Sequence, residues 1–506
     1  MSTASKQKGS DDFVERPGEV YVAETELKKG AIGLTGAIMQ NVTHIAPAVA
    51  AFLFTPTLVN FAGTQAPLAY LIGFIIVLAL GVTLVQLAKR FPSAGGYFTY
   101  VSRTVGPRAG FLVGWLFSFY SPIVTGPFLA FLGLILEGEL SANFGVTWFQ
   151  WWMLVIVGAP LVALFGYLGV SISMKVIVIV GAFEFLVVLA LGVSGLINPG
   201  PGGFTFETFN GGFDPSGLLT GAGFALAVVF TVQGLTGWEA AVPLAEETEN
   251  PRRNVPIATM ASIGIIGVML VIVIWGQVIG WGVDDLANLP GSPELPALVI
   301  AHRVWGGAWW LALVVIVTSV LGGSLAFQNV ATRMWFGMGR AGVLPKVLGQ
   351  VHPVRKTPTA AITVHLILAL VVGLGGGFLL GPDVVFILIL GFVLVIAVIL
   401  IYVLANLGVV LYYWREQRSK FNWILHFIFP VGTSIILLYS LFASFNPIPA
   451  APYGFAPIIV GVWLVIGVII LIVFKLRGNT EWMKLAAQSA EERPETADEK
   501  QHRPTV

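Results

Sequence analysis

A polar run, Gln40-Asn41-Val42-Thr43-His44, lies inside a long apolar segment near the start of the chain. This segment, residues 31–59, contains no lysine, arginine, aspartate or glutamate. As a helix it would reach roughly 40 Å, enough to cross a bilayer core of about 30 Å. Pro47 follows the run, and proline removes a backbone donor, so we expect the helix to bend or break here. Irregular backbone at membrane depth is tolerated where it lines a cavity, and the run therefore predicts half of a ligand site.

A second run of the same kind interrupts the sixth apolar segment, which reads Thr231-Val232-Gln233-Gly234-Leu235-Thr236-Gly237-Trp238-Glu239. The two interrupted segments are five segments apart, which places them at matching positions of two inverted halves. Paired interrupted helices in such halves indicate the midplane site of a secondary transporter. We expect ligand contacts from Gln233, Gly234, Leu235, Thr236 and Gly237, because glycines let a ligand approach the backbone. The alternative is that both runs only join helices through interhelical hydrogen bonds.

Glu184 is the third candidate, in the middle of the predicted fifth segment between Phe183 and Phe185. A charged carboxylate at the bilayer centre costs about 2.5–3.5 kcal/mol, so it needs a partner, a proton or a cavity. Glu184 could load and release a proton that drives transport, or face a substrate ammonium, or remain a neutral acid bonded to a neighbouring helix. His44 could also couple transport to protons, since an ordinary imidazole titrates near neutral pH.

The composition identifies the class of protein. The chain has 506 residues, of which 56% are hydrophobic and only 10% are charged, whereas soluble proteins carry about 25% charged residues. Without cysteine it has no disulfide or thiolate metal site, and no nucleotide-binding, metal-ligand or nucleophile motif is visible. We predict a polytopic all-α membrane protein that is not an enzyme and that needs no cofactor, metal or nucleic acid. The net charge of +1 has no bearing on nucleic acid binding.

The apolar segments predict about twelve transmembrane helices. They cover residues 31–59, 66–87, 110–136, 148–168, 174–197, 218–245, 256–281, 308–337, 358–380, 384–413, 424–445 and 456–474. With the N-terminus inside, Arg303 is the one residue among the 27 lysines and arginines that falls in an outer loop. This bias predicts cytoplasmic termini.

Three motifs then resemble the amino acid–polyamine–organocation superfamily. The first is Phe91-Pro92-Ser93-Ala94-Gly95-Gly96-Tyr97 with Gly106 to Phe111. The second joins Gly237-Trp238-Glu239 to the loop from Glu246 to Pro256, and the third runs from Arg333 to Pro345 and on to Thr357-Pro358. The resemblance implies a five-plus-five inverted-repeat core with broken helices 1 and 6, two extra helices, alternating access, and amino acids or organic amines as substrates.

The chain departs from this superfamily at one point. Members often carry Gly-x-Gly in the break of the first helix, where bare amides bind the substrate carboxylate. That element falls on Gln40-Asn41-Val42, which has no glycine. Side chains of the polar run could supply the donors instead, or the substrate could lack an α-carboxylate.

The sequence thus predicts a proton-coupled symporter for a small amino acid or related amine, with an amine or polyamine carrier or exchanger as the alternative. A channel or membrane sensor is the alternative outside transport, and sodium coupling stays open. We expect cytoplasmic tails at residues 1–29 and 477–506, a core at 30–413 and two added helices at 414–476. We also expect the protein, as a monomer or dimer, in the plasma membrane. The loop glutamates Glu246, Glu247 and Glu249 could form ion pairs with Arg252, Arg253, Arg333 and Arg340 that latch an inner gate.

Overall fold

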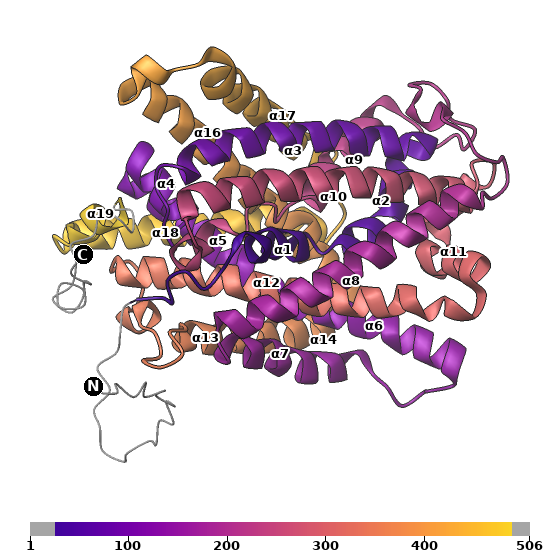
Figure 1. Ribbon diagram of the computed structural model, residues 1–506, viewed down its shortest axis with the longest axis horizontal. Helices are drawn as coiled ribbons and strands as arrows, with labels where there is room; N and C mark the ends of the chain where they lie inside the picture. The colour runs from indigo at the N-terminus through magenta and orange to yellow at the C-terminus, as the bar shows by residue number, and fades with distance from the viewer. Residues whose placement is uncertain (1–25, 488–506) are drawn as a thin grey trace, which may run out of the picture.

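The computed structural model describes residues 26–487 as a bundle of helices (Figure 1). Within this range there is no strand, apart from one bridge that pairs Ile32 with Thr248. The all-α membrane fold that the sequence predicted is therefore confirmed. Most of the two predicted tails, residues 1–25 and 488–506, lies outside the described residues.

Ten helices of the described chain are long and apolar enough to cross a membrane. They are Leu34–Leu53, Thr55–Ala88, Pro107–Phe144, Val170–Ile197, Pro251–Trp281, Trp310–Arg340, Thr359–Leu380, Pro382–Arg415, Ile424–Ser444 and Tyr453–Leu476. Two shorter apolar helices, Trp151–Tyr167 and Gly221–Gly234, occupy the fourth and sixth predicted positions. Every predicted segment therefore contains an apolar helix, and the two short ones belong to the same bundle.

The first half of the bundle contains spans 1 to 5. They are span 1, α1 (Leu34–Ile45) and α2 (Thr55–Ala62); span 2, α3 (Ala66–Ala88); span 3, α5 (Pro107–Ile123) and α6 (Thr125–Phe144); span 4, α7 (Trp151–Tyr167); and span 5, α8 (Val170–Ile197). A short helix, α4 (Tyr97–Thr104), lies in the loop before span 3.

The second half contains spans 6 to 10. They are span 6, α9 (Gly221–Gly234) and the turns that follow it; span 7, α10 (Pro251–Trp281); span 8, α12 (Trp310–Arg340); span 9, α13 (Thr359–Leu370) and α14 (Gly376–Leu380); and span 10, α15 (Pro382–Phe386) and α16 (Leu394–Arg415). The short helix α11 (Pro296–Trp305) precedes span 8.

Both predicted breaks are present. The polar run of span 1 is itself helical, and the break begins just after it, at Ala46, whose φ of 54° is left-handed. A π-helical turn, Val49–Leu53, follows Pro47 and leads into α2. In span 6, α9 ends at Gly234, Gly237 has a φ of 118°, and a 3-10 turn covers Val242–Glu247.

The packing of the two halves is reciprocal. Span 1 packs through α1 on α10 of span 7, and span 6 packs through α9 on α3 of span 2. The matching spans α3 and α10 run side by side along the bundle, with α1 near its centre (Figure 1). Spans 3 and 8 also contact each other, as do spans 4 and 9. Such exchanged contacts are those of two repeats related by a pseudo-two-fold axis.

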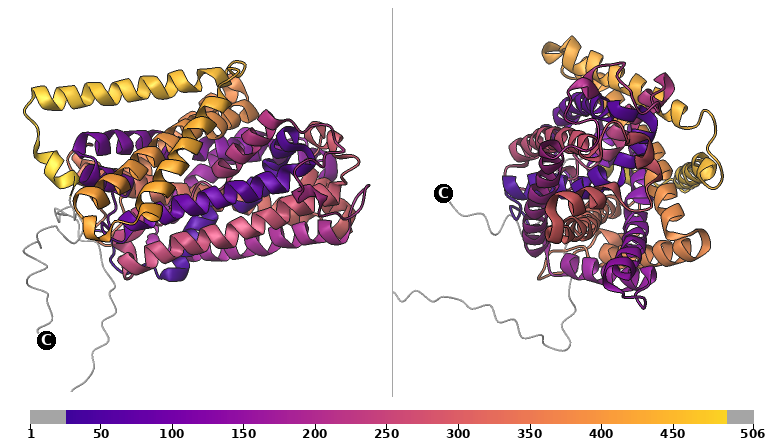
Figure 2. Two further views of the ribbon diagram at one scale, coloured as in Figure 1. Left: turned by 90° about the horizontal axis from the view of Figure 1, so that it is seen from above. Right: turned by 90° about the vertical axis from the view of Figure 1, so that its right-hand side faces the viewer.

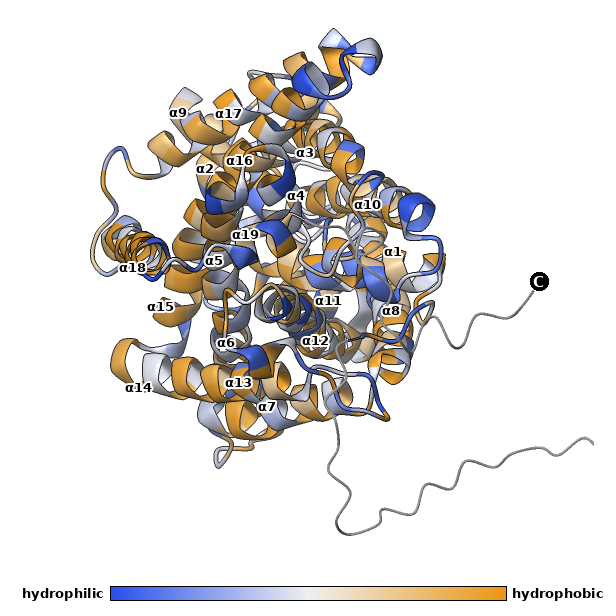
Figure 3. Cartoon of the chain, turned by 90° about the vertical axis from the view of Figure 1, so that its left-hand side faces the viewer, coloured by the Kyte–Doolittle hydropathy of each residue, from blue (hydrophilic) through white to orange (hydrophobic). Residues whose placement is uncertain are grey.

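Spans 11 and 12, α17 (Phe429–Ser444) and α18 (Ala456–Leu476), lie outside this core. Helix α18 contacts α5 but stands apart along one side of the bundle (Figure 2). Hydrophobic residues cover most of the helices, and hydrophilic residues gather in loops and at helix ends (Figure 3). Large apolar side chains such as Ile179 and Leu379 are exposed on this surface, as expected where the solvent is lipid. The last described helix is α19 (Glu481–Ala486).

Candidate substrate site

A cavity with about 400 Å³ of empty space lies where the two helix breaks meet; we call it the central cavity. Spans 1, 3, 6, 8 and 10 contribute its lining: His44, Ile45, Val49, Phe54, Phe128, Gln233, Gly234, Thr236, Phe327, Leu390 and Leu394. Small-molecule sites usually combine apolar walls with a few polar groups. The central cavity has this character, because apolar side chains surround His44, Gln233 and Thr236.

Four of the predicted contact residues line the central cavity: His44 from span 1, and Gln233, Gly234 and Thr236 from span 6. The His44 ring packs on Phe327, with ring centroids 3.8 Å apart. A Cβ built on Gly237 would lie 2.6 Å from His44 Cδ2, so this glycine brings the two breaks into direct contact. Its positive φ is a second reason why another residue would be strained there.

The other predicted residues do not line the central cavity. Gln40 donates to the Ala326 carbonyl at 3.1 Å. Asn41 donates to the Ser262 hydroxyl at 3.0 Å and accepts from the Ala241 amide at 2.6 Å. Thr43 donates to the Ile177 carbonyl at 3.3 Å. Val42 and Leu235 are buried among apolar neighbours. The hydrogen bonds of Gln40, Asn41 and Thr43 join α1 to spans 5, 7 and 8 and to the turn of span 6.

Glu184 lies beside the break of span 1 rather than in the lining of the central cavity. Its Oε1 accepts from the Ala48 amide at 2.8 Å and from the Ser319 hydroxyl of span 8. The side chain is fully buried, and its Oε2 has no hydrogen-bond partner among the described residues. Glu184 therefore accepts a hydrogen bond from a backbone donor at the break, while its second carboxyl oxygen has no partner among the described residues.

Glu239 has the corresponding place at the break of span 6. It accepts from the Gly237 amide at 3.2 Å and from the Tyr402 hydroxyl of span 10 at 2.6 Å. These contacts hold the unwound backbone of span 6 to itself and to span 10.

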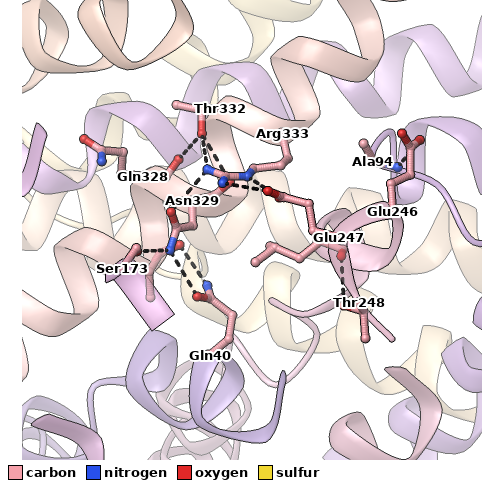
Figure 4. A network of polar contacts seen from close by, with 12 residues as sticks. Gln40, Ala94, Ser173, Glu246, Glu247, Thr248, Gln328, Asn329, Thr332 and Arg333 are labelled. Carbon is pink, nitrogen blue, oxygen red and sulfur yellow. Dashed lines mark hydrogen bonds and ion pairs between the residues drawn. The ribbon is translucent and has the colours of Figure 1, made fainter. Parts of the chain in front are cut away.

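A buried polar network joins span 1 to the turn after span 6 (Figure 4). Asn329 of span 8 donates to Gln40 at 3.3 Å and to Ser173 at 2.9 Å. Arg333, one turn further along the helix, donates to Asn329 at 3.2 Å and forms an ion pair with Glu247 at 2.8 Å. The side chains of Arg333 and Glu247 are 1% and 0% exposed, so this pair is isolated from solvent.

A second ion pair joins the same turn to the end of span 8. Arg340 contacts both oxygens of Glu246, at 2.9 and 2.6 Å, and the Ala94 amide donates to Glu246 at 2.9 Å. Two of the ion pairs that the sequence suggested, Arg333 with Glu247 and Arg340 with Glu246, are thus present.

Most of the cavity wall could not be predicted from the sequence. Ile45, Val49, Phe54, Phe128, Phe327, Leu390 and Leu394 were not predicted as site residues. Each is an apolar residue in an apolar span, so nothing distinguishes it from its lipid-facing neighbours before the helices are packed. Within residues 26–487 no group of three or more His, Cys, Asp or Glu side chains could hold a metal ion.

The family model for amino acid permeases matches residues 36–485. The chain belongs to this family. It is therefore a multi-pass membrane protein and a secondary transporter for amino acids or amines, as the resemblance to the amino acid–polyamine–organocation superfamily predicted. The family and the relatives are transporters, not enzymes.

Three relatives illustrate the range of the family. The low-affinity putrescine importer PlaP of Escherichia coli (strain K12) is 26% identical over 70% of this permease and 75% of PlaP. The branched-chain amino acid permease BcaP of Bacillus subtilis (strain 168) is 28% identical over 61% of this chain and 67% of BcaP. The aspartate-proton symporter of the same organism is 26% identical over 61% and 60% of the two chains.

Proposed function

We propose that this permease imports a small neutral amino acid in symport with protons by alternating access. The observation that carries the proposal is the central cavity, which is lined by both broken helices at once. The proposed substrate contacts are His44, Gln233, Gly234 and Thr236, with the backbone of Leu235 and Gly237. Gln40, Asn41, Val42 and Thr43 enter the proposal as residues that hold α1 in position.

The charge of the cavity supports a neutral ligand. Among the residues that line it there is no aspartate, glutamate, lysine or arginine. Burying a net charge without a partner is costly, so a zwitterion is favoured over a dication. The carboxyl ends of α1 and α9 reach the cavity at Ile45 and Gly234 and would favour the ammonium group. The start of the second half of span 1, with Val49 in the lining, would favour the carboxylate.

Glu184 is our proposed coupling residue. Its carboxyl group accepts a hydrogen bond from the break of span 1 through one oxygen, and the other oxygen is buried with no partner within residues 26–487. Loading a proton there would change how strongly the break is held to spans 5 and 8. The relative that is an aspartate-proton symporter supports proton coupling, while sodium coupling and exchange are the competing mechanisms.

An amine carrier is the second candidate, supported by the relative that is a putrescine importer and by the missing glycines at residues 40–42. Glu184 does not line the central cavity in this conformation, so an amine would need another counter-ion. The absence of an acidic lining residue is the reason for preferring the amino acid.

We also propose the plasma membrane as the location, with both termini cytoplasmic. The distribution of lysine and arginine supports this orientation. The ten-helix core would cover residues 30–413, and residues 414–476 would add two further transmembrane helices.

The test begins with thermal shifts of the purified protein in the presence of amino acids and amines. A ligand at 100 times its dissociation constant stabilises by about 2.7 kcal/mol, so weak substrates are also visible. We expect neutral amino acids to stabilise the protein. A Gly234→Val variant should lose this shift, because a Cβ at Gly234 has room to point into the cavity without a clash.

Gly264→Val is the matched control, since Gly264 is a helical glycine with nothing within 4 Å of its built Cβ and no place in the cavity lining. Uptake by proteoliposomes then separates the mechanisms. Accumulation against the substrate gradient under an inward proton gradient supports symport. A passive leak would instead indicate a channel, and stabilisation by amines alone would make the amine carrier the better description.

A further inference from the structure

A second cavity lies next to the central cavity, between spans 6, 10 and 11; we call it the side cavity. It has about 320 Å³ of empty space. Its lining consists of Val229, Val232, Gln233, Thr236, Val395, Val398, Ile399, Tyr402, Leu437 and Ser440. The three hydroxyl groups of this lining are already engaged: Tyr402 donates to Glu239, Ser440 to the Ile436 carbonyl and Thr236 to the Val232 carbonyl. The side cavity is therefore suited to a hydrocarbon group.

Only two residues, Gln233 and Thr236, line both cavities. They are also the only residues between Thr231 and Ala245 that keep appreciable accessible surface. Their side chains therefore lie between the two spaces and form a shared wall.

The Gln233 side chain closes this wall by reaching across to span 10. Its Nε2 donates to the Leu390 carbonyl at 2.5 Å, and Leu390 belongs to the π-helical turn Ile387–Val393. Further along span 10 the division continues, because Leu394 lines the central cavity and the adjacent Val395 lines the side cavity. The Gln233 amide, with Thr236 beside it, thus separates the two cavities.

We propose that Gln233 sets the largest substrate side chain by closing the central cavity off from the side cavity. With Gln233 in place, a substrate is confined to the central cavity. With a shorter residue at this position, the aliphatic part of a longer substrate enters the side cavity and contacts its valine, isoleucine and leucine side chains. This inference rests on the proposed function, since it assumes that the central cavity holds the substrate.

The experiment measures affinities of the full-length protein for unbranched 2-amino acids of increasing chain length. In the wild type we expect affinity to rise and then fall once the chain exceeds the central cavity. In Gln233→Ala we expect the rise to continue, at about fourfold for each added methylene, which is about 0.8 kcal/mol. The readout is the ratio of long-chain to short-chain affinity, so a general loss of affinity does not affect it.

Filling the side cavity provides the control. Val398 lines only the side cavity, so Val398→Phe alone should leave the wild-type chain-length profile unchanged. In the double variant with Gln233→Ala, Val398→Phe should restore the wild-type limit on substrate chain length. Gln233→Asn, which is one methylene shorter and keeps the amide, should move the limit by a smaller step and serves if the alanine variant does not fold.

The outcomes are distinct. If the wild type binds the short amino acids and the Gln233 variants show the same limit on chain length, Gln233 does not close the central cavity and the proposal is wrong. If the limit moves but Val398→Phe does not restore it, the longer chain does not occupy the side cavity and the proposal is again wrong. If the wild type binds none of the amino acids, the proposed function fails instead.

Discussion

The two helix breaks use the same chemistry but take it from different places. At the break of span 6, the Gly237 amide donates to Glu239, two residues away in the same turn. At the break of span 1, the Ala48 amide donates to Glu184, which belongs to span 5. In both cases a buried carboxyl group satisfies a backbone donor that would be costly to leave unpaired in a membrane.

This difference predicts that the hydrogen bond at the break of span 1, but not the one at the break of span 6, changes when the spans move relative to each other. A cap from the same turn moves with its break, and Gly237 is also packed against His44 with no room for a side chain. A cap from another helix holds only while spans 1 and 5 keep their relative positions. We therefore expect conformational change to be sensed at Glu184 and not at Glu239.

The two breaks are also tied together on span 8. Gln40 of span 1 bonds to Asn329, and Glu247 after span 6 pairs with Arg333, so the network spans both halves of the fold (Figure 4). Loss of the Arg333–Glu247 ion pair should therefore destabilise the protein more than loss of a hydrogen bond to Glu184 or Glu239.

Glu247→Gln should lower the free energy of unfolding by about 3–5 kcal/mol, because it leaves the buried Arg333 without a counter-charge. Chemical or thermal unfolding of the purified protein measures this change. The control is Glu416→Gln, which breaks the Arg103–Glu416 pair, whose side chains are 35% and 41% exposed. That variant should cost about 0–1 kcal/mol. Equal losses of unfolding free energy in the two variants would show that the buried Arg333–Glu247 pair does not hold the two breaks together.

Glu184→Gln and Glu239→Gln test the comparison of the two caps directly. Glutamine keeps an acceptor for the backbone amide but removes the titratable group. We expect uptake driven by a proton gradient to fall by about tenfold or more in Glu184→Gln, and much less in Glu239→Gln. Counterflow of labelled substrate without a gradient should survive in both. Similar loss of gradient-driven uptake in the two variants would remove the distinction between the breaks.

Ser319→Ala and Tyr402→Phe each delete one hydroxyl that donates to a capping glutamate. Interhelical hydrogen bonds in membranes contribute about 0.6–1.7 kcal/mol, so both variants should lose stability in that range. Only Ser319→Ala should shift the pH dependence of transport, because only its partner is the proposed coupling residue. A shift of the same size in Tyr402→Phe would argue against that assignment.

Asp214 gives the smallest expected effect. It lies between Thr64, after span 1, and Leu219, before span 6. Partial burial acts to raise its pKa, but hydrogen bonds from the Ser216 hydroxyl, the Leu219 amide and Thr64 lower the pKa below the ordinary value of 3.8. The stabilisation from these bonds is complete above the ordinary pKa and is lost as the pH falls through the lowered pKa.

Hydrogen exchange of residues 211–220, corrected for intrinsic rates, should therefore accelerate as the pH is lowered from about 6 to about 3. Asp214→Asn is the control and should show little pH dependence in this loop. An unchanged exchange rate in the wild type would show that Asp214 does not anchor the loop between spans 5 and 6 to Thr64.

The sequence was informative wherever a residue differs in type from the apolar residues around it. Polar groups and glycines inside apolar segments indicated both breaks, and a single carboxyl group in span 5 indicated Glu184. The exact position of the first break was less clear, since the polar run is helical and the chain departs from α-helix only at Ala46. Pro47 indicated the break, but Ala46, the residue before it, adopts the left-handed conformation.

The sequence by itself determined the all-helical membrane fold, the paired breaks and the family, because membrane depth imposes length and polarity on every span. The tertiary structure decided which polar groups face the ligand space and which face other helices. Gln40, Asn41 and Thr43 lie on the packed side of α1, whereas His44 lines the central cavity. Residues one turn or less apart on a helix can face different neighbours, and only the packing of the other spans decides which neighbour each one meets.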